Sequence, residues 1–414
     1  MKNFILIVFS LITFLSVGNL RADGKCYDFQ LLGGGERIAN FGMDTTSHWW
    51  AITSPFDQRY RLYVDSIRTE VYDYISTPVF SSDGNRWASF GATITGWWMI
   101  DETESASILC EQPVFIKYSP NSKILAYSCR SGQRETITIG DREIRVHKRH
   151  EASGFYMNYD GSKYAFVREQ SGSYVMNING DEGTLFDRIL PIGYWHDGTF
   201  LYAALNGINW EVYRDRDAIT QTYSGISNVR INLKGDVAAF VGRHFSGQSS
   251  GVLINDEFYE PLEGEYYDGI WGMSLHPYLP IMAYNANRDL AQFVLMNNTE
   301  YFGGEYTGEP IFTHDGEDMY FIGCNAHCFC NISGQKFKIE GMLSYKEHYA
   351  MKPGSETICY RTSSSMVVRD LFSGELTAGR MVDAISTPRY NRKLDCYETL
   401  GLIRNRLYML VCKI

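Results

Sequence analysis

Several features are scarce in this sequence, and each absence excludes a class of protein. Proline contributes only 11 of 414 residues, whereas glycine contributes 38 and tyrosine 29, which favours strands joined by tight turns. The 38 basic residues form no clusters and are outnumbered by 48 acidic ones, which argues against binding to nucleic acid. Beyond the N-terminal segment, no stretch is apolar enough to span a membrane. An apolar content of 44% excludes a disordered chain.

The N-terminal segment has the pattern of a secretory signal peptide. Lys2 precedes an apolar run from Phe4 to Val17, and small and polar residues follow up to Ala22. The run is shorter than the roughly 20 residues of a membrane span. We therefore expect residues 1–22 to be removed and residues 23–414 to form an exported protein, periplasmic or extracellular.

One motif recurs along the rest of the chain. It is a strand end, a tight turn, and a second strand in which a small buried residue adjoins an aromatic one, as in residues 158–166. Its turn position is occupied by Gly84, Ser122, Gly161, Gly198, Gly235, Leu279, Gly316 and Gly354, and the same step reaches Thr45 and Arg392. The mean step is (392 − 45)/9, about 39 residues, which is typical of one four-stranded blade.

This spacing predicts an all-β fold, a β-propeller of four-stranded blades that fills residues 23–414. The ten copies leave open eight to ten blades, in one ring or in two smaller rings. Cys26–Leu32 is expected to add a strand to the last, incomplete blade. The alternating segments of one repeat predict strands at Val114–Tyr118, Ile124–Cys129, Glu135–Ile139 and Glu143–Lys148.

The repeated phrase resembles the WD40-like (PD40-like) repeat of TolB-type β-propellers. The resemblance covers nearly all of residues 40–400, and it implies a fold more than an activity. Recognition of other proteins, through loops on one face or through a central channel, is what it implies about function. The short turns after the third strand of a repeat fit it too, at Gly140-Asp141, Asn179-Gly180 and Asn255-Asp256.

Aspartate precedes glycine in four of the repeated turns, and we assign these pairs to the structure of the turn. An Asp side chain accepts hydrogen bonds from nearby backbone N–H groups, and glycine tolerates a positive φ. The pairs are Asp83-Gly84, Asp160-Gly161, Asp197-Gly198 and Asp315-Gly316. The adjacent histidines His196, His276 and His314 are assigned in the same way.

The nine cysteines predict disulfides, because an exported chain meets an oxidising environment. An odd number leaves at least one outside an intramolecular pair. Cys26 is expected to bond to Cys412 or to Cys396, and Cys110 to Cys129.

A second group of cysteines lies within residues 324–330. A cross-strand disulfide there takes two of them, with Cys324 and Cys328 as candidates. The alternative is a zinc site of Cys324, His327, Cys328 and Cys330. We expect no metal and no cofactor.

Two further patterns bear on function. Gly247 to Gly251 matches the Gly-x-Ser-x-Gly of serine hydrolases, but that motif needs a strand–turn–helix elbow, and a hairpin turn is expected here. Trp97 and Trp98 are adjacent on a predicted strand, so their rings face opposite ways. These two and the pair Trp49 and Trp50 are the candidate binding residues, although each tryptophan taken alone is more often part of a core.

The sequence therefore predicts a non-catalytic module or scaffold that binds another protein or an envelope glycan. The alternative is a hydrolase acting on glycans or peptides, with carboxylates in the channel of the propeller. A mainly structural role in the cell envelope also stays open.

Overall fold

A computed structural model describes most of the chain, and its regular elements are all β-strands. The predicted signal peptide lies outside the described residues, among which no helix is long and apolar enough to cross a membrane. Two compact units are present: Met1–Thr77, Gly91–Ile94 and Glu340–Ile414 form the first, and Pro78–Phe90 and Thr95–Ile339 the second. The described residues are 26–103, 109–132, 134–147, 154–232, 234–242, 251–255, 257–259, 267–297, 299–313, 316–339, 349–352 and 357–413.

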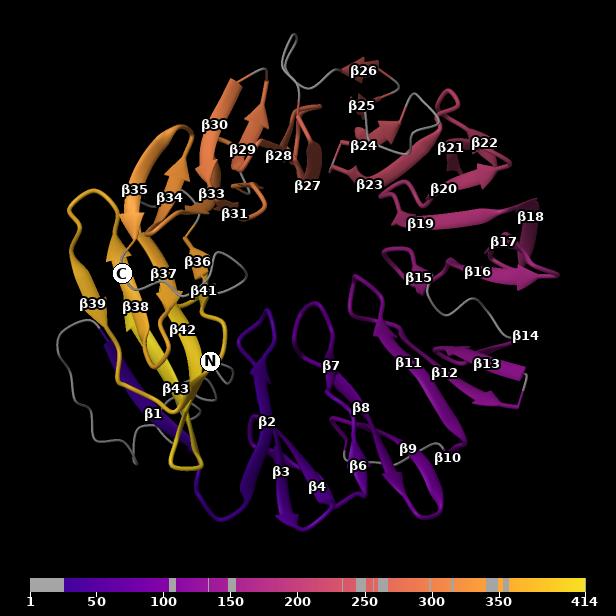
Figure 1. The fold of residues 1–414 in the computed structure, drawn as a ribbon. Coiled ribbons are helices and arrows are strands. Elements are labelled where there is room, and N and C mark those ends of the chain that lie inside the picture. Colours follow the sequence, from indigo (N-terminus) through magenta and orange to yellow (C-terminus); the bar gives the residue numbers. More distant parts are fainter. Residues whose placement is uncertain are drawn as a thin grey trace, which may run out of the picture. The chain divides into compact units, whose positions relative to one another are not determined.

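Three antiparallel groups of strands lie wholly within the first unit, and Tyr74–Ile75 pairs with Gly91 and Ala92 of a further sheet (Figure 1). β2–β5 and β36–β39 are two of them, and the third joins both ends of the chain in the order β1-β43-β42-β40, with β41 also paired to β42. The strands are β1 (Cys26–Leu32), β2 (Arg37–Met43), β3 (Trp49–Phe56), β4 (Arg59–Val64), β5 (Ile67–Arg68), β6 (Tyr74–Ile75), β36 (Tyr349–Met351), β37 (Thr357–Arg361), β38 (Met366–Asp370), β39 (Leu376–Ala378), β40 (Ala384–Ile385), β41 (Arg389–Asn391), β42 (Cys396–Ile403) and β43 (Arg406–Lys413).

The second unit repeats the same four-stranded plan. β11–β14, β15–β18, β19–β22 and β23–β26 each form a sheet, and one parallel bridge between Gly304 and Cys324 joins β27–β30 to β31–β35. Strand β8 is divided between the units. The strands are β7 (Val79–Phe80), β8 (Trp87–Thr93), β9 (Gly96–Asp101), β10 (Leu109–Cys110), β11 (Gln112–Tyr118), β12 (Leu125–Ser131), β13 (Arg134–Ile139), β14 (Arg142–His147), β15 (Phe155–Met157), β16 (Tyr164–Gln170), β17 (Ser173–Ile178), β18 (Asp181–Phe186), β19 (Arg188–Tyr194), β20 (Phe200–Asn206), β21 (Asn209–Arg214), β22 (Asp217–Ala218), β23 (Gly225–Ile231), β24 (Val237–Gly242), β25 (Gly251–Ile254), β26 (Glu257–Tyr259), β27 (Gly269–Leu275), β28 (Met282–Arg288), β29 (Ala291–Met296), β30 (Thr299–Gly304), β31 (Tyr306–Thr307), β32 (Ile311–Phe312), β33 (Met319–Cys324), β34 (Cys328–Ile332) and β35 (Gln335–Ile339).

Successive sheets of the second unit are arranged like blades. Figure 1 shows the first strands β11, β15, β19, β23 and β27 along one side of this unit and the fourth strands β14, β18, β22 and β26 along the other. The prediction of an all-β chain built from four-stranded antiparallel sheets is confirmed. The four strands predicted between residues 114 and 148 agree with β11–β14 to within two residues.

The N-terminal strand completes the last sheet, as predicted. β1 is antiparallel to β43, with Cys26 opposite Cys412, and a disulfide joins these two residues. Cys396, the other candidate partner, is a buried free thiol whose pKa is raised to about 11, chiefly by burial. Cys129 is also disulfide-bonded, and the side chain of its expected partner, Cys110, lies outside the described residues.

The hydrophobic core lies between neighbouring sheets. The small residue of the motif lies on the second strand of a sheet and packs in this core. Ala165 and Phe200 share one cluster, and Ala203 and Val241 share the next. A methyl side chain lets two sheets approach closely while the aromatic neighbour fills the space beside it. Fully buried alanines of the second strands include Ala51, Ala88, Ala126, Ala165, Ala203, Ala238, Ala239 and Ala283.

The repeated turns between first and second strands hold a residue at positive φ. In the second unit this residue packs against the preceding turn. A Cβ on Gly161 would lie 2.8 Å from Ile124 Cβ, and one on Gly235 would lie 2.7 Å from a Trp195 ring carbon. The positive-φ residues of the motif are Gly84, Ser122, Gly161, Gly198, Gly235 and Gly316.

Hydrogen bonds connect several turns of this series to the next. Asp83 N–H donates to Ser122 Oγ at 2.9 Å, and Asn121 N–H donates to the Tyr159 carbonyl at 3.0 Å. His276 Nδ1 accepts two backbone N–H groups of its own turn, which leaves Nε2–H to donate to the Gly316 carbonyl at 3.0 Å. The assignment of His276 to the turn agrees with this geometry.

Three turn positions differ from those that the repeat step predicts. Leu279 has no positive φ, because the His276 ring organises that turn through side-chain hydrogen bonds. Ser47 replaces Thr45 as the positive-φ residue of the first turn, and Asp395 replaces Arg392 in the last. The reason is that these turns differ in length, so a fixed step cannot locate the left-handed residue. His314, Asp315 and Gly354 lie outside the described residues.

Gly161→Ala is expected to cost more stability than Gly207→Ala. Both glycines have positive φ, but nothing lies within 4 Å of a Cβ at Gly207, whereas Ile124 blocks one at Gly161. The backbone strain alone costs about 1–2 kcal/mol, and overpacking adds about 1–3 kcal/mol. Urea unfolding of the two variants measures the difference, and equal losses would contradict the packing of turn on turn.

Replacing Cys26 and Cys412 together by serine is expected to lower stability much more than replacing Cys324 and Cys328. The first disulfide closes a loop with a sequence separation of 386 residues and the second one of only 4. In the chain-entropy model these contribute on the order of 5 and about 2 kcal/mol. Denaturant midpoints of the two double variants test the ranking, with intact mass spectra confirming the remaining disulfides.

Candidate interaction surface

The predicted binding tryptophans separate into two groups. Trp49 and Trp50 are buried: Trp49 belongs to the core cluster between β3 and β42–β43, and Trp50 packs on Gly42. Trp97 and Trp98 on β9 are both half-buried. Burial assigns the first pair to packing, so among these four tryptophans only Trp97 and Trp98 keep exposed surface with which to bind.

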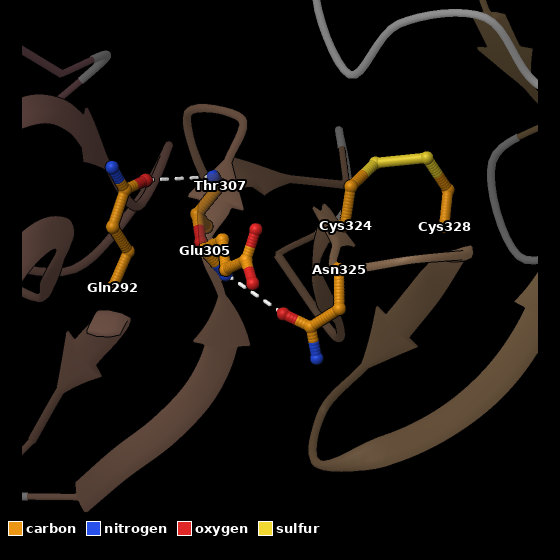
Figure 2. Close-up of a disulfide and its surroundings, with 6 residues drawn as sticks. All are labelled: Gln292, Glu305, Thr307, Cys324, Asn325 and Cys328. Atoms are coloured by element: carbon orange, nitrogen blue, oxygen red, sulfur yellow. Dashed lines mark hydrogen bonds between the residues drawn. A yellow bond between two sulfur atoms is a disulfide. The ribbon is translucent and has the colours of Figure 1, made fainter. Parts of the chain in front are cut away.

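A disulfide-closed hairpin lies elsewhere in the second unit, between β33 and β34. Cys324 and Cys328 face each other across this hairpin and form the second disulfide of the described residues (Figure 2). The turn that it closes, residues 325–327, is exposed. The covalent bond therefore fixes a short exposed loop.

The connection from β30 to β31 is held against this loop by backbone hydrogen bonds. Glu305 N–H donates to Asn325 Oδ1 at 2.8 Å and to the Cys324 carbonyl at 3.1 Å. Thr307 N–H donates to Gln292 Oε1 at 2.7 Å, which ties the same connection to β29 (Figure 2). Gly304, at φ 105°, is required here, since a Cβ would lie 2.6 Å from Asn325 Oδ1.

Exposed side chains stand on this fixed backbone. Leu290, in the turn that precedes β29, is 92% exposed, and Tyr306 is 52% exposed. Gln292 lies opposite Gly304 in the antiparallel pair β29–β30, so the turn that holds Leu290 and the connection that holds Tyr306 lie at the same end of this pair. We call this set the disulfide-loop surface, and define it as Asp289, Leu290, Glu305, Tyr306, Glu309 and residues 325–327.

The cysteine geometry bears on the zinc alternative. The sulfur atoms of Cys324 and Cys328 are bonded to each other, so neither is a thiolate ligand in this state. Cys330 is a buried thiol whose pKa burial raises to about 12, which suppresses its thiolate. In the described part of the chain, no three His, Cys, Asp or Glu side chains are grouped to hold a metal ion. Most of the Gly247–Gly251 pattern lies outside the described residues.

A polar cluster occupies the first unit, where the turn before β3 meets β41 and β42. The buried carboxylate of Glu398 accepts hydrogen bonds from Ser47 Oγ, from Asn391 Nδ2 at 3.1 Å and from Arg389 Nε at 3.0 Å. Asn391 Nδ2 also donates to Ser47 Oγ at 2.7 Å. The carboxylate is thus fully occupied in joining two sheets, which is a structural role.

His48 flanks this cluster and gives it a pH dependence. The hydrogen bond of 2.5 Å that His48 Nδ1–H donates to the Asp65 carboxylate raises the pKa of His48, while partial burial and Arg389 oppose the rise and Asp44 supports it. Because the pKa is higher in the folded state, the contribution to stability is fully present below the unfolded value of about 6.5. It is lost as the pH rises through the folded pKa.

His48→Gln is accordingly expected to lower the melting temperature more at pH 5 than at pH 8.5. Thermal unfolding at the two pH values measures the difference between variant and parent. His327→Gln, at an exposed histidine of the disulfide loop, is the control and should show no such pH dependence. A His48→Gln effect that is equal at both pH values would contradict the assignment.

Comparisons with known proteins assign no family and no activity to this chain. No protein-family model and no curated protein matches the chain. Among solved structures, it is similar to prolyl endopeptidases (12% identity, TM-score 0.37), covering 82% of this chain but only 55% of that one. The propeller domain of the trilobed protease of Pyrococcus furiosus gives 10% identity and a TM-score of 0.32, with 75% of this chain and 99% of that one covered. The Dos1 propeller gives 9% and 0.36, with 92% and 93% covered.

Proposed function

We propose that this protein is an exported binding module that recognises another protein through the disulfide-loop surface and has no catalytic activity of its own. The observation that carries the proposal is the exposure of Leu290 and Tyr306 on a backbone fixed by a disulfide and by hydrogen bonds. A loop held in one conformation loses little conformational entropy on binding. Exposed apolar and aromatic side chains in a polar setting are the usual anchors of protein interfaces.

The proposal includes finer points of the fold. The strand groups are blades of a TolB-type, WD40-like propeller, about ten in number, and residues 1–22 are a cleaved signal peptide. The disulfides support export, because such bonds persist in oxidising compartments. The mass of the protein recovered from envelope and culture fractions tests cleavage, and retention of residues 1–22 would contradict it.

A photo-crosslinking residue at position 306 is expected to capture a protein partner in envelope fractions. The same residue at position 208 is the matched control, because Ile208 is another exposed apolar residue, 57% exposed, in the β20–β21 turn. Leu290→Ser should reduce capture at position 306 severalfold. Equal capture at both positions, or none at position 306, would count against this surface.

Removal of the Cys324–Cys328 disulfide is expected to weaken partner binding by about threefold to tenfold with little loss of stability. The reason is that the loop must then be ordered on binding, at about 0.5–1.5 kcal/mol for each immobilised side chain. Affinity of the double serine variant for the captured partner measures this loss. Unchanged affinity would show that the fixed loop is not part of the interface.

A further inference from the structure

The disulfide-loop surface is acidic around its apolar residues. Asp289, Glu305 and Glu309 are exposed, and none of them forms an ion pair within the part of the chain that the structure describes. The surface contains no lysine or arginine. Of the nearby cations, Arg288 is already paired with Glu300 at 3.1 Å, and Lys336 lies over the Phe302 and Phe329 rings.

A buried hydrogen-bond acceptor lies beneath the same connection. Asn285 on β28 is fully buried, and its Nδ2 donates to the carbonyls of Thr307 and Gly308 at 3.2 and 3.1 Å. Its Oδ1 has no hydrogen-bond partner among the described residues. A Cβ on Gly272 would lie 3.1 Å from this Oδ1 and 2.8 Å from Glu309 Cγ, so Glu309 lies beside it.

These two observations favour the same kind of ligand group. The unpartnered Asn285 oxygen is buried, so a partner does not contact it, but its partial negative charge adds to the negative charge of the exposed carboxylates. Lysine and arginine supply positively charged donors without an acceptor. Three unpaired carboxylates around Leu290 and Tyr306 repel an acidic partner and attract a basic one. The apolar side chains supply the contact area that charges alone do not.

We propose that the disulfide-loop surface binds a segment of a partner protein rich in lysine or arginine, with an apolar side chain between the basic residues. This inference rests on the proposed function and specifies its partner. The apolar side chain packs against Leu290 and Tyr306, and the basic groups pair with Asp289, Glu305 and Glu309. Exposed pairs of this kind contribute modestly each and are weakened by salt.

Three fluorescent synthetic peptides test the proposal. They share the same leucine and phenylalanine residues and carry lysine, glutamine or glutamate at the positions between them. Fluorescence anisotropy with the mature, disulfide-intact protein measures their affinities at about 50 and 300 mM salt. The lysine peptide should bind at least tenfold more tightly than the glutamine peptide, and its affinity should fall at high salt. The glutamate peptide should have the lowest affinity of the three.

Variants of the surface separate charge from apolar contact. The affinity of the lysine peptide should fall about tenfold, and most of its salt dependence should be lost, in the triple variant Asp289→Asn, Glu305→Gln and Glu309→Gln. Leu290→Ser should weaken both the lysine and the glutamine peptides. The matched controls, Ile208→Ser and Asp217→Asn in another sheet, should leave both affinities unchanged.

The outcomes distinguish this inference from the proposed function. If the lysine and glutamine peptides bind equally and Leu290→Ser weakens both, the proposal of a basic partner is overturned. Protein binding at this surface would still stand. Failure of the lysine peptide to bind, or binding that the surface variants do not change, also overturns the basic partner. The crosslinking experiment at position 306 then decides on the proposed function separately.

Discussion

The contact of one turn with the next is the constraint on which the rest of this structure depends. Most of the described turns between a first and a second strand hold a positive-φ residue, and at Gly161, Gly198, Gly235 and Gly316 a side chain of the preceding turn packs on it. A hydrogen bond from turn to turn accompanies the packing, and in the first unit Asn391 and Ser47 repeat the arrangement. Because each turn fixes its neighbour, the sheets keep a regular spacing and the buried alanines can meet across it.

The disulfides Cys26–Cys412 and Cys324–Cys328 act on different scales. Cys26–Cys412 joins the first and the last strand within one sheet, so it restricts the unfolded chain as a whole. Cys324–Cys328 spans a single hairpin turn and restricts very little of the unfolded chain. Its effect is local. It fixes residues 325–327, and the backbone N–H of Glu305 donates a hydrogen bond to Asn325 in this loop. A covalent bond that adds little to global stability is thus placed where a loop carries exposed side chains.

The disulfide-loop surface lies where the regular plan of separate sheets is interrupted. The single bridge between Gly304 and Cys324 merges two strand groups that elsewhere stay separate sheets. This merger brings the turn before β29, the connection after β30 and the closed hairpin together. A rigid backbone that carries exposed carboxylates and exposed apolar side chains is suited to binding a partner, because little conformational entropy is lost on binding.

Much of the fold was predictable from sequence because it is encoded locally. Turn chemistry and strand alternation act over a few residues, so the strands of residues 114–148, the strand Cys26–Leu32 and the turn at Gly161 follow from the pattern. Strand register and packing decided three further features. They are the pairing of Cys26 with Cys412 and not with Cys396, the burial of Trp49 and Trp50, and the positive φ of Ser47 in place of Thr45. The disulfide-loop surface depended on hydrogen bonds between segments that the sequence does not show to be neighbours. Local propensities thus determined the elements, and long-range contacts decided which side chains were buried and which were left exposed.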